Sequence, residues 1–545
     1  MRSPLSRTLN DLLDEVAGTN PNRPAFYWQS QVVSYGRWQE QSQAVAGALT
    51  GLGLRRGDAV GLLVSNRPEW LFAAFGAWRR GCTVVPFSTW SRTWDLEYLL
   101  GHPGLSVLVT LGALRNQNYL EELRVLVPEL WLAAPGEWRS ERFPELKHVV
   151  VVGDEVPRGA LAYDAWLRDA GLRPWADLPP GDGPSAIDVA CVLYTSGSTS
   201  RPKAVQLQHY AMIENGFNIG ERQRMGSADR VWLPVPLFWS YGSSNALMAT
   251  LTHGAALVLQ EVFDASKALE LIEHHACTVA YTLPTITQAL ISHPNFQPEQ
   301  VRSLAKGLTI GLPEDVRKAA EVLGIRGICN IYGATETYGN CCVTSADDPL
   351  SLRMETQGEP LPGVTIRIRH PESGEFLPAN TPGEIWVSGY ITPGYLRDQA
   401  TTAALSAAEG FFRTGDLGQL DSSGRLHFLG RISEVIKTKG INVSPLEIEE
   451  FICRHTAVAE AAVIGVADAE DGQVAVAFVV PKAGGDLSAD AIRSYCLAHI
   501  ARYKVPALVV ICDALPKTAT NKLVRKELVQ EATQRYQKAQ EELLS

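Results

Sequence analysis

Apolar residues in the first half of the chain form short runs that alternate with stretches of helical periodicity. Residues 59–66 (AVGLLVSN) form a nearly continuous apolar run, which is typical of a buried strand. Residues 67–81 repeat apolar positions at helical spacing and end on a glycine, and residues 82–88 form a second apolar run. Strand, helix and strand at this spacing predict parallel α/β layers. We expect a second α/β region from about 229 to 344.

The pattern changes in the second half of the chain. From about residue 358, the stretches VTIRIRH, GEIWVSG and GRLHFLG are separated by turn residues and predict a small β-subdomain. Further on, two apolar stretches predict a strand pair, a helix is expected from about Ser488, and a charged amphipathic helix ends the sequence. We therefore expect an α/β protein with a large domain at 1–431, made of layered α/β subdomains plus the small β-subdomain. A small α+β domain is expected at 432–545.

Composition places the chain among ordinary soluble globular proteins. Of its 545 residues, 46% are hydrophobic and 20% are charged, and the formal net charge is −10. An acidic balance argues against a broad nucleic-acid or anionic-membrane surface, because both need a basic face. Any anionic substrate is therefore expected to be held by a few local groups.

Features that would indicate secretion, a membrane or a metal cage are missing from the sequence. The N-terminal segment has no apolar core, and no stretch approaches the ~18 apolar residues of a membrane span. Nine cysteines without a Cys-x-x-Cys pair favour free thiols in a reducing compartment over disulfides or zinc. Eleven histidines show no metal-ligand spacing. We expect a cytoplasmic protein.

A hydroxyl-rich loop between two apolar flanks is the first candidate site. It reads TSGSTSRPK, and its candidate anion-binding residues are Thr195, Ser196, Gly197, Ser198, Thr199 and Lys203. Hydroxyls, the backbone N–H groups around a glycine and one lysine charge together can cradle phosphates. The loop is not of the Walker type, because Gly197 is not followed five residues later by Gly-Lys-Ser/Thr. Its composition alone is equally consistent with a solvated turn.

This loop is one of seven motifs that follow one another along nearly the whole chain. They are YTSGSTSRPKAV (194–205), PLFWSYG (236–242), IYGATET (331–337), GEIWVSG (383–389), TGDLGQLDSSGRLHFLGR (414–431), IKTKGINVSPLEIEE (436–450) and PKTATNKLVRKEL (516–528). In these motifs and their order the chain resembles the adenylate-forming superfamily. Its members include acyl-CoA synthetases, aryl-CoA ligases, adenylation domains of nonribosomal synthetases and beetle luciferases. The resemblance implies a large adenylation domain hinged to a small C-terminal domain.

The resemblance also implies a set of nucleotide contacts. Thr335 is expected to contact the α-phosphate of ATP and Tyr332 to pack against adenine. Glu336 is expected to bind the Mg²⁺ that bridges the phosphates, since Mg²⁺ on ATP usually takes only one or two carboxylates. Asp416 is expected to accept hydrogen bonds from the ribose hydroxyls, and Arg431 to make a second ribose or phosphate contact. Without the motif context, Glu336 and Arg431 are ordinary surface charges.

The C-terminal motifs imply a second half-reaction. Lys522 matches the superfamily's catalytic lysine, which bridges the substrate carboxylate and the α-phosphate. In the family the small domain then rotates about a hinge, matched here by Ser433, so that one site runs two chemistries. Lys439 and Gly440 then line the tunnel for the pantetheine of coenzyme A. The charged neighbours of Lys522, including Arg525, are expected to be solvated.

Several positions depart from the family pattern. The phosphate loop usually has glycine where this chain has Ser200 and Ala204, the hinge is commonly Asp or Lys rather than Ser433, and glycine rather than Asn521 usually precedes the catalytic lysine. Trp239 takes a position often held by histidine at the mouth of the acyl pocket. The catalytic lysine, the metal carboxylate and the ribose aspartate are all retained, so we expect an active enzyme.

The acyl pocket is expected to mix aromatic and small residues. Its candidates are Trp239, Tyr241, Gly242, Leu283, Thr309, Gly311, Ala334 and Tyr338, although each residue taken singly is as consistent with ordinary core. The stretch FWSYGSSNAL lacks the aspartate that pairs with the ammonium of an amino acid. We therefore expect a neutral, mostly apolar acid of the aryl, alicyclic or medium-chain acyl class. A very bulky polycyclic acid and a long fatty chain stay open as alternatives, because spacing does not give the depth of the pocket.

Three functional classes follow from these residues. The first is an ATP- and Mg²⁺-dependent acid–thiol ligase that uses coenzyme A. The second is an acyl-AMP ligase that loads a separate carrier protein. The third is a catalytically weak ATP-binding regulatory protein, suggested by the departures in the loop and the hinge. Thioester formation with free coenzyme A separates the first from the second, and ATP binding without turnover indicates the third.

Overall fold

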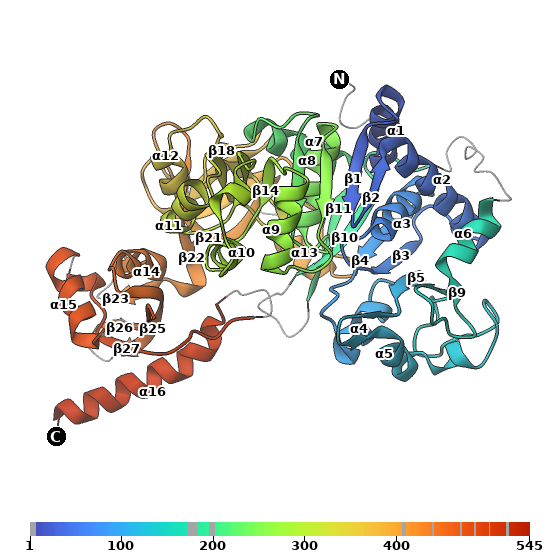
Figure 1. Cartoon of the computed structure of the whole chain (residues 1–545). Coiled ribbons are helices and arrows are strands. Elements are labelled where there is room, and N and C mark those ends of the chain that lie inside the picture. Colours follow the sequence, from blue (N-terminus) through green and yellow to red (C-terminus); the bar gives the residue numbers. More distant parts are fainter. Residues whose placement is uncertain are drawn as a thin grey trace. The chain divides into compact units, whose positions relative to one another are not determined.

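The chain folds into two compact units (Figure 1). The computed structural model describes residues 7–171, 183–195, 202–405, 410–438, 441–468, 471–483, 487–500, 502–518 and 523–544. The first unit holds Met1–Met354, Gly358–Thr365 and Val387–Phe412, and the second holds Glu355–Gln357, Ile366–Trp386 and Arg413–Ser545. The boundary expected after Arg431 falls inside the second unit and stays a prediction.

A nine-stranded sheet forms the larger layer of the first unit. Its order is β18 (Glu359–Pro360), β17 (Cys342–Val343), β16 (Gly327–Tyr332), β15 (Lys306–Thr309), β14 (Val279–Tyr281), β12 (Arg230–Leu233), β13 (Ala256–Leu259), β1 (Pro24–Trp28) and β2 (Gln31–Ser34). The six strands from β16 to β1 run parallel, and the edge strands are antiparallel. Continuous burial of β12, β13 and β14 agrees with their apolar sequences, because parallel strands are covered on both faces.

A seven-stranded sheet forms the second layer of this unit. Its order is β11 (Lys203–Gln208), β10 (Val189–Thr195), β4 (Thr83–Pro86), β3 (Ala59–Leu63), β5 (Leu105–Leu111), β8 (His148–Val152) and β9 (Leu161–Ala162). Its strands are parallel except for β11, which pairs with β10 as an antiparallel hairpin. A small ribbon, β6 (Ala113–Leu114) with β7 (Gln117–Asn118), stands apart from both sheets.

Helices α2 (Tyr35–Gly51) and α3 (Pro68–Arg79) connect the two layers through an aromatic core. Trp38 of α2 meets Phe26 of β1 at 5.7 Å and Phe75 of α3 at 4.6 Å between ring centroids. On the other side, the indole of Trp78 donates to the carbonyl of Ala190 on β10 at 2.7 Å. Burying each large apolar side chain contributes roughly 1.5–3 kcal/mol, so this core is a major part of the unit's stability.

The remaining helices before residue 406 cover the sheets (Figure 1). They are α1 (Leu9–Thr19), α4 (Thr93–Gly101), α5 (Tyr119–Leu126), α6 (Tyr163–Gly171), α7 (His209–Arg222), α8 (Met248–Thr252), α9 (Ala265–His274), α10 (Pro284–Ile291), α11 (Pro313–Arg317), α12 (Leu350–Glu355) and α13 (Gln399–Leu405). Helix α1 begins with a capping box, in which Thr8 and Asp11 satisfy each other's backbone N–H groups.

The second unit contains most of a four-stranded sheet and all of a five-stranded one. The first has the order β19 (Thr365–Arg369), β20 (Gly383–Ser388), β21 (Phe412–Leu420) and β22 (Leu426–Arg431). The second has the order β24 (Ile441–Val443), β23 (Ile436–Thr438), β26 (Gly472–Pro481) and β25 (Val458–Asp468), with β27 (Leu508–Ile511) parallel to β26. Helices α14 (Pro445–Cys453), α15 (Ala489–His499) and α16 (Arg525–Leu544) accompany the latter sheet.

The α/β class, the parallel layers and the later β-rich region predicted from the sequence are confirmed. The 59–66, 67–81 and 82–88 predictions correspond to β3, α3 and β4, each three residues shorter than predicted. The predicted strand pair is β25 and β26, and Ser488 caps α15. None of the described helices is both long enough and apolar enough to cross a membrane.

Candidate functional site

Most residues of the predicted acyl pocket follow the carboxyl ends of four neighbouring parallel strands in the first unit. The pairs β12–β14, β14–β15 and β15–β16 place these ends along one edge of the nine-stranded sheet. Ligands in open α/β sheets bind at this edge. Trp239, Tyr241 and Gly242 follow β12, and Leu283 follows β14. Thr309 ends β15, and Gly311 comes two residues later. Ala334 follows β16, as does Glu336, the predicted metal ligand.

A π-helical turn, Tyr241–Leu247, fixes the β12 side of this edge. The buried hydroxyl of Tyr241 donates toward the carbonyl oxygens of Leu308 at 2.9 Å and Thr282 at 3.1 Å, which tie the turn to β15 and β14. Gly242 leaves no room for a side chain, since an added Cβ would lie 2.1 Å from the carbonyl oxygen of Pro236. Turns of π type interrupt helices frequently at functional sites.

Thr309 carries an unusual buried hydroxyl. The residue is fully buried at the end of β15, and its Oγ1 has no hydrogen-bond partner among the described residues. A buried hydroxyl without a partner costs about 1–3 kcal/mol, so this atom is suited to meet a polar group of a ligand or a water molecule.

The motif IYGATET forms a tight loop after β16. Thr335–Thr337 is a 3₁₀ turn, which Tyr338 ends in a left-handed conformation with φ of 58°. The carbonyl oxygen of Tyr338 accepts hydrogen bonds from Asn215 at 3.0 Å, Ser244 at 3.0 Å and Asn245 at 2.8 Å. Three donors on one oxygen hold the loop in this conformation, and two of them belong to the π-helical turn.

The side chains of this loop point in different directions. The Tyr338 ring is fully buried, and its hydroxyl accepts a hydrogen bond from the backbone of Gln208 on β11 at 3.0 Å. Thr335 Oγ1 lies 3.4 Å from Ser240 Oγ, which joins the predicted nucleotide motif to the predicted acyl motif. Tyr332, the predicted adenine contact, is largely buried at the end of β16.

Glu336 is held by a segment that sequence analysis did not single out. Its carboxylate oxygen Oε1 accepts a hydrogen bond from the Tyr395 hydroxyl at 2.8 Å. Its carbonyl oxygen accepts a second from the backbone of Thr392 at 2.7 Å. Burial and the neighbouring carboxylate raise the pKa of Tyr395, so its hydroxyl keeps the proton that it donates.

The hydroxyl-rich loop is anchored by the hairpin of β10 and β11. Thr195 and Lys203 face each other as the last pair of this hairpin. The Lys203 ammonium lies 5.2 Å from the ring centroid of Tyr395, which places its charge near Glu336. Ser196, Gly197, Ser198 and Thr199 lie outside the described residues, as do Lys439, Gly440 and Lys522.

Glu336 is suited to Mg²⁺ that is bound mainly through phosphates. In the part of the chain that the structure describes, no group of three or more His, Cys, Asp and Glu side chains could hold a metal by itself. A single half-buried carboxylate with a fixed orientation fits a cation that takes its other ligands from ATP and water.

The predicted ribose residues form a pair in the second unit. Asp416 on β21 lies directly opposite Arg431 on β22, and Arg431 Nε is 2.9 Å from Asp416 Oδ1. The Asp416 side chain is 6% exposed, and its backbone N–H donates to Thr414 Oγ1 at 3.0 Å. Asp416 lies in the middle of β21, and an ionised carboxylate fixed by an arginine can also accept hydrogen bonds from neutral hydroxyls.

The predicted hinge residue, Ser433, is the exposed middle residue of a 3₁₀ turn, Ile432–Glu434. Next to Ser433, the Glu434 carboxylate lies 2.9 Å from Nε of Arg525. Arg525 also makes two hydrogen bonds, of 2.7 and 2.8 Å, to the carboxylate of Glu449. The expectation that Arg525 is solvated is therefore wrong, because two acidic side chains and burial hold it.

Trp90 is a further residue near the predicted acyl motif that sequence analysis missed. Its ring meets those of Phe238 and Trp239 edge to face, both at 5.2 Å between centroids. Trp90 follows β4 of the seven-stranded sheet, whereas Phe238 and Trp239 follow β12 of the other sheet. The two layers therefore share an aromatic cluster that includes Trp239.

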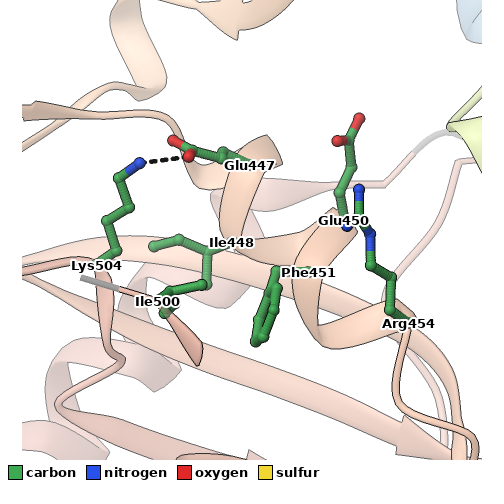
Figure 2. A pocket seen from close by; sticks show the side chains of 7 residues that line it. All are labelled: Glu447, Ile448, Glu450, Phe451, Arg454, Ile500 and Lys504. Atoms are coloured by element: carbon green, nitrogen blue, oxygen red, sulfur yellow. Dashed lines mark hydrogen bonds and ion pairs between the residues drawn. The ribbon is translucent and has the colours of Figure 1, made fainter. Parts of the chain in front are cut away.

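A hollow of about 150 Å³ lies in the second unit, alongside α14 (Figure 2). Its lining residues are Glu447, Ile448, Glu450, Phe451, Arg454, Ile500 and Lys504. Lys504 pairs with Glu447, and Arg454 lies beside Glu450, whose pKa is raised by burial. The opposite charges leave this hollow close to neutral, unlike a phosphate site.

Comparison with known proteins places these motifs in one family. The family model described as AMP-binding enzyme matches residues 13–396, and the model described as AMP-binding enzyme C-terminal domain matches residues 447–522. A Bacillus subtilis (strain 168) protein named "Putative acyl-CoA synthetase YngI" is 32% identical over 96% of each chain. The mouse protein named "Medium-chain acyl-CoA ligase ACSF2, mitochondrial" is 28% identical over 97% of this chain and 88% of its own length.

Solved structures agree with this relationship. The structure of the anthranilate CoA ligase AuaEII in complex with anthranoyl-AMP is 25% identical, covers 98% of this chain and 99% of its own, and has a TM-score of 0.85. ATP-bound MatB from Rhodopseudomonas palustris is 25% identical over 97% of this chain and 99% of its own, with a TM-score of 0.82. The chain belongs to the AMP-binding enzyme family, the adenylate-forming superfamily that its seven motifs indicated.

Proposed function

We propose that this enzyme is an ATP- and Mg²⁺-dependent acid–thiol ligase that joins a carboxylic acid to coenzyme A. One observation carries the proposal: the predicted acyl residues and the Thr335–Glu336 loop share one strand-end edge, where Ser240 and Thr335 touch. An acid bound on the β12 side of that contact lies next to a nucleotide bound on the β16 side. The relatives named above, which include acyl-CoA and anthranilate CoA ligases, support the same assignment.

The first half-reaction joins two anions, so the site must neutralise and align them. A carboxylate oxygen of the acid attacks the α-phosphorus of ATP, the bond to the bridging oxygen breaks, and pyrophosphate leaves. Lys203 and Thr195 would hold the phosphates, Thr335 the α-phosphate, and Glu336 the Mg²⁺. Bound Mg²⁺ would offset phosphate charge, and Lys522 would bridge carboxylate and phosphate.

The second half-reaction moves the acyl group to sulfur. The thiolate of coenzyme A attacks the carbonyl carbon of the acyl-adenylate, and AMP leaves with the electron pair of the carbon–oxygen bond. In the proposal, the domain 432–545 turns about Ser433 between the two steps. It then presents Lys439 and Gly440 to the pantetheine, while Asp416 and Arg431 hold the ribose.

The acid is proposed to be an aryl, alicyclic or medium-chain acid. The Trp90, Phe238 and Trp239 rings offer apolar surface at the edge that also carries Tyr241. The unpartnered hydroxyl of Thr309 offers one polar contact, which suits an acid with a single hydrogen-bonding substituent. No carboxylate lies in the stretch FWSYGSSNAL to pair with an amino-acid ammonium.

Acid-dependent ATP–pyrophosphate exchange tests this proposal. The enzyme is assayed over a panel of aryl, alicyclic, medium-chain, long-chain and amino acids, and coenzyme A is then added with each acid that supports exchange. Exchange with one apolar acid class, followed by thioester formation, is the expected result. Exchange without thioester would indicate a separate carrier protein as acceptor. ATP binding without exchange for any acid would favour a regulatory ATP-binding protein.

A further inference from the structure

Tyr395 lies where three parts of the first unit meet. It is 5% exposed and belongs to the segment between β20 and α13. Its backbone forms a bridge with Val205 of β11, and the next residue, Leu396, donates to the carbonyl of Ala204 at 2.9 Å. The segment is therefore attached to the strand that begins with Lys203.

The same segment holds Glu336 at two points. The Tyr395 hydroxyl donates to Oε1 of the carboxylate at 2.8 Å, and the Thr392 N–H donates to the Glu336 carbonyl at 2.7 Å. Thr392 is itself fixed to β11, because its hydroxyl donates to the Gln206 carbonyl at 2.7 Å. The backbone and the side chain of Glu336 are therefore both held in position relative to β11, through Thr392 and Tyr395.

The ring of Tyr395 also meets the lysine of the phosphate loop. Lys203 Nζ lies 5.2 Å from the ring centroid, within the range of a cation–π contact. One side chain therefore contacts a carboxylate through its hydroxyl and an ammonium through its face. These are the two charges that the proposed function assigns to the metal and to the phosphates.

We infer that Tyr395 is a positioning residue, which orients the Glu336 carboxylate toward Mg²⁺ and fixes its position relative to the Lys203 ammonium. The inference rests on the proposed function. A hydrogen bond to Oε1 restricts the rotation of the carboxylate and leaves its second oxygen for the cation. Without the hydroxyl, that order must be established when Mg²⁺ and ATP bind, so their binding weakens together. Binding of the acid, which involves other residues of the edge, is not affected.

The test is a titration of ATP binding with Mg²⁺, measured by calorimetry on the full chain. Tyr395→Phe removes the hydroxyl and keeps the ring over Lys203. Because the Glu336 carboxylate must then be ordered when the cation binds, the Mg²⁺ concentration for half-maximal ATP binding is expected to rise about three- to tenfold. ATP binding without Mg²⁺ and the KM for the acid are expected to stay within about twofold.

Tyr390→Phe is the matched control. Tyr390 lies in the same segment, is partly buried and packs edge to face against Tyr210 instead of Glu336. This control is expected to keep the wild-type Mg²⁺ requirement. A second variant, Tyr395→Leu, also removes the ring and is expected to weaken ATP binding even without Mg²⁺.

Two results would overturn the inference. The first is a wild-type Mg²⁺ requirement in Tyr395→Phe, which together with a lowered melting temperature would make the hydrogen bond purely structural. The second is an equal rise in Tyr390→Phe. Absence of acid-dependent exchange in the wild-type enzyme would instead refute the proposed function. The ATP titration would still measure the effect of Tyr395 on Mg²⁺-dependent ATP binding.

Discussion

Replacing Arg525 by methionine should destabilise the C-terminal part of the chain. The guanidinium donates to both oxygens of Glu449, to the carbonyl of Val463 at 2.8 Å, and lies 2.9 Å from Glu434. The side chains of Arg525 and Glu449 are 19% and 6% exposed. The substitution keeps an unbranched chain as far as the position of Nε, removes the charged end of the guanidinium, and leaves the Glu449 carboxylate buried without its main partner.

The size of the destabilisation depends on how well Glu449 and Glu434 are hydrogen-bonded or hydrated once the guanidinium is gone. Breaking a buried ion pair by removing one partner costs about 3–5 kcal/mol. Glu449 keeps a hydrogen bond from the Val463 N–H at 2.6 Å, and Glu434, whose side chain is 36% exposed, can be hydrated again. These two compensations favour the lower limit, about 3 kcal/mol, which corresponds to a factor of more than a hundred in the opening equilibrium.

Native-state hydrogen exchange followed by mass spectrometry measures the local opening free energy of this region. A local measurement is needed because a chain of two units is not expected to unfold in one step. Amides of β25 and α14 are expected to exchange about a hundredfold faster in Arg525→Met. The control is Arg535→Met, which removes an exposed pair with Glu531 on the same helix and is expected to change stability by about 0.5 kcal/mol or less. Equal exchange in both variants would refute the reasoning from burial.

Three further predictions concern other parts of the molecule. Lys522→Ala should slow adenylate formation about a hundredfold or more while sparing thioester formation from a supplied acyl-adenylate; equal loss of both steps would contradict its role. Gly242→Ala places a Cβ 2.1 Å from the carbonyl oxygen of Pro236, so acid-dependent exchange should fall sharply while ATP affinity is kept, and a loss of both would indicate misfolding. Burial lowers the pKa of His209 to about 4, which Asp188 partly opposes. The folded state therefore binds fewer protons than the unfolded state, and this contribution to stability, about 3 kcal/mol, is complete above pH 6.5 and is lost as the pH falls toward 4. Melting temperatures from pH 7 to 4 should fall less steeply in His209→Asn, and parallel curves would contradict this assignment.

Much of the fold was predictable because the patterns are local. A run such as 59–66 has few alternatives to a buried strand, and β3 begins where it was expected. The predicted pocket residues lie at or shortly after the ends of strands, but the sequence analysis did not predict that these ends share one edge. What the spacing does not contain is the order of the strands, which brings β12, β14, β15 and β16 together.

The parts that the sequence did not predict depend on contacts between distant segments. Tyr395 meets Glu336 only because its segment adds to β11, and no periodicity indicates that bridge. Arg525 lies in a charged stretch, which normally indicates solvent, yet its partner Glu449 is on another helix, 76 residues earlier. Trp90 and Trp239 follow strands of different sheets, so their contact requires knowledge of how the layers pack.

The placement of the predicted acyl residues after separate strands has a consequence for how the proposed enzyme could change its preference among acids. Each predicted wall of the pocket would be carried by its own strand, and the parallel sheet behind it does not depend on which side chain follows the strand. Substitutions at Leu283, after β14, and at Trp239, after β12, should therefore combine additively in the logarithm of kcat/KM when their side chains do not touch. The acid preference of such a site can change in evolution by substitutions after one strand at a time, without an intermediate sequence that fails to fold.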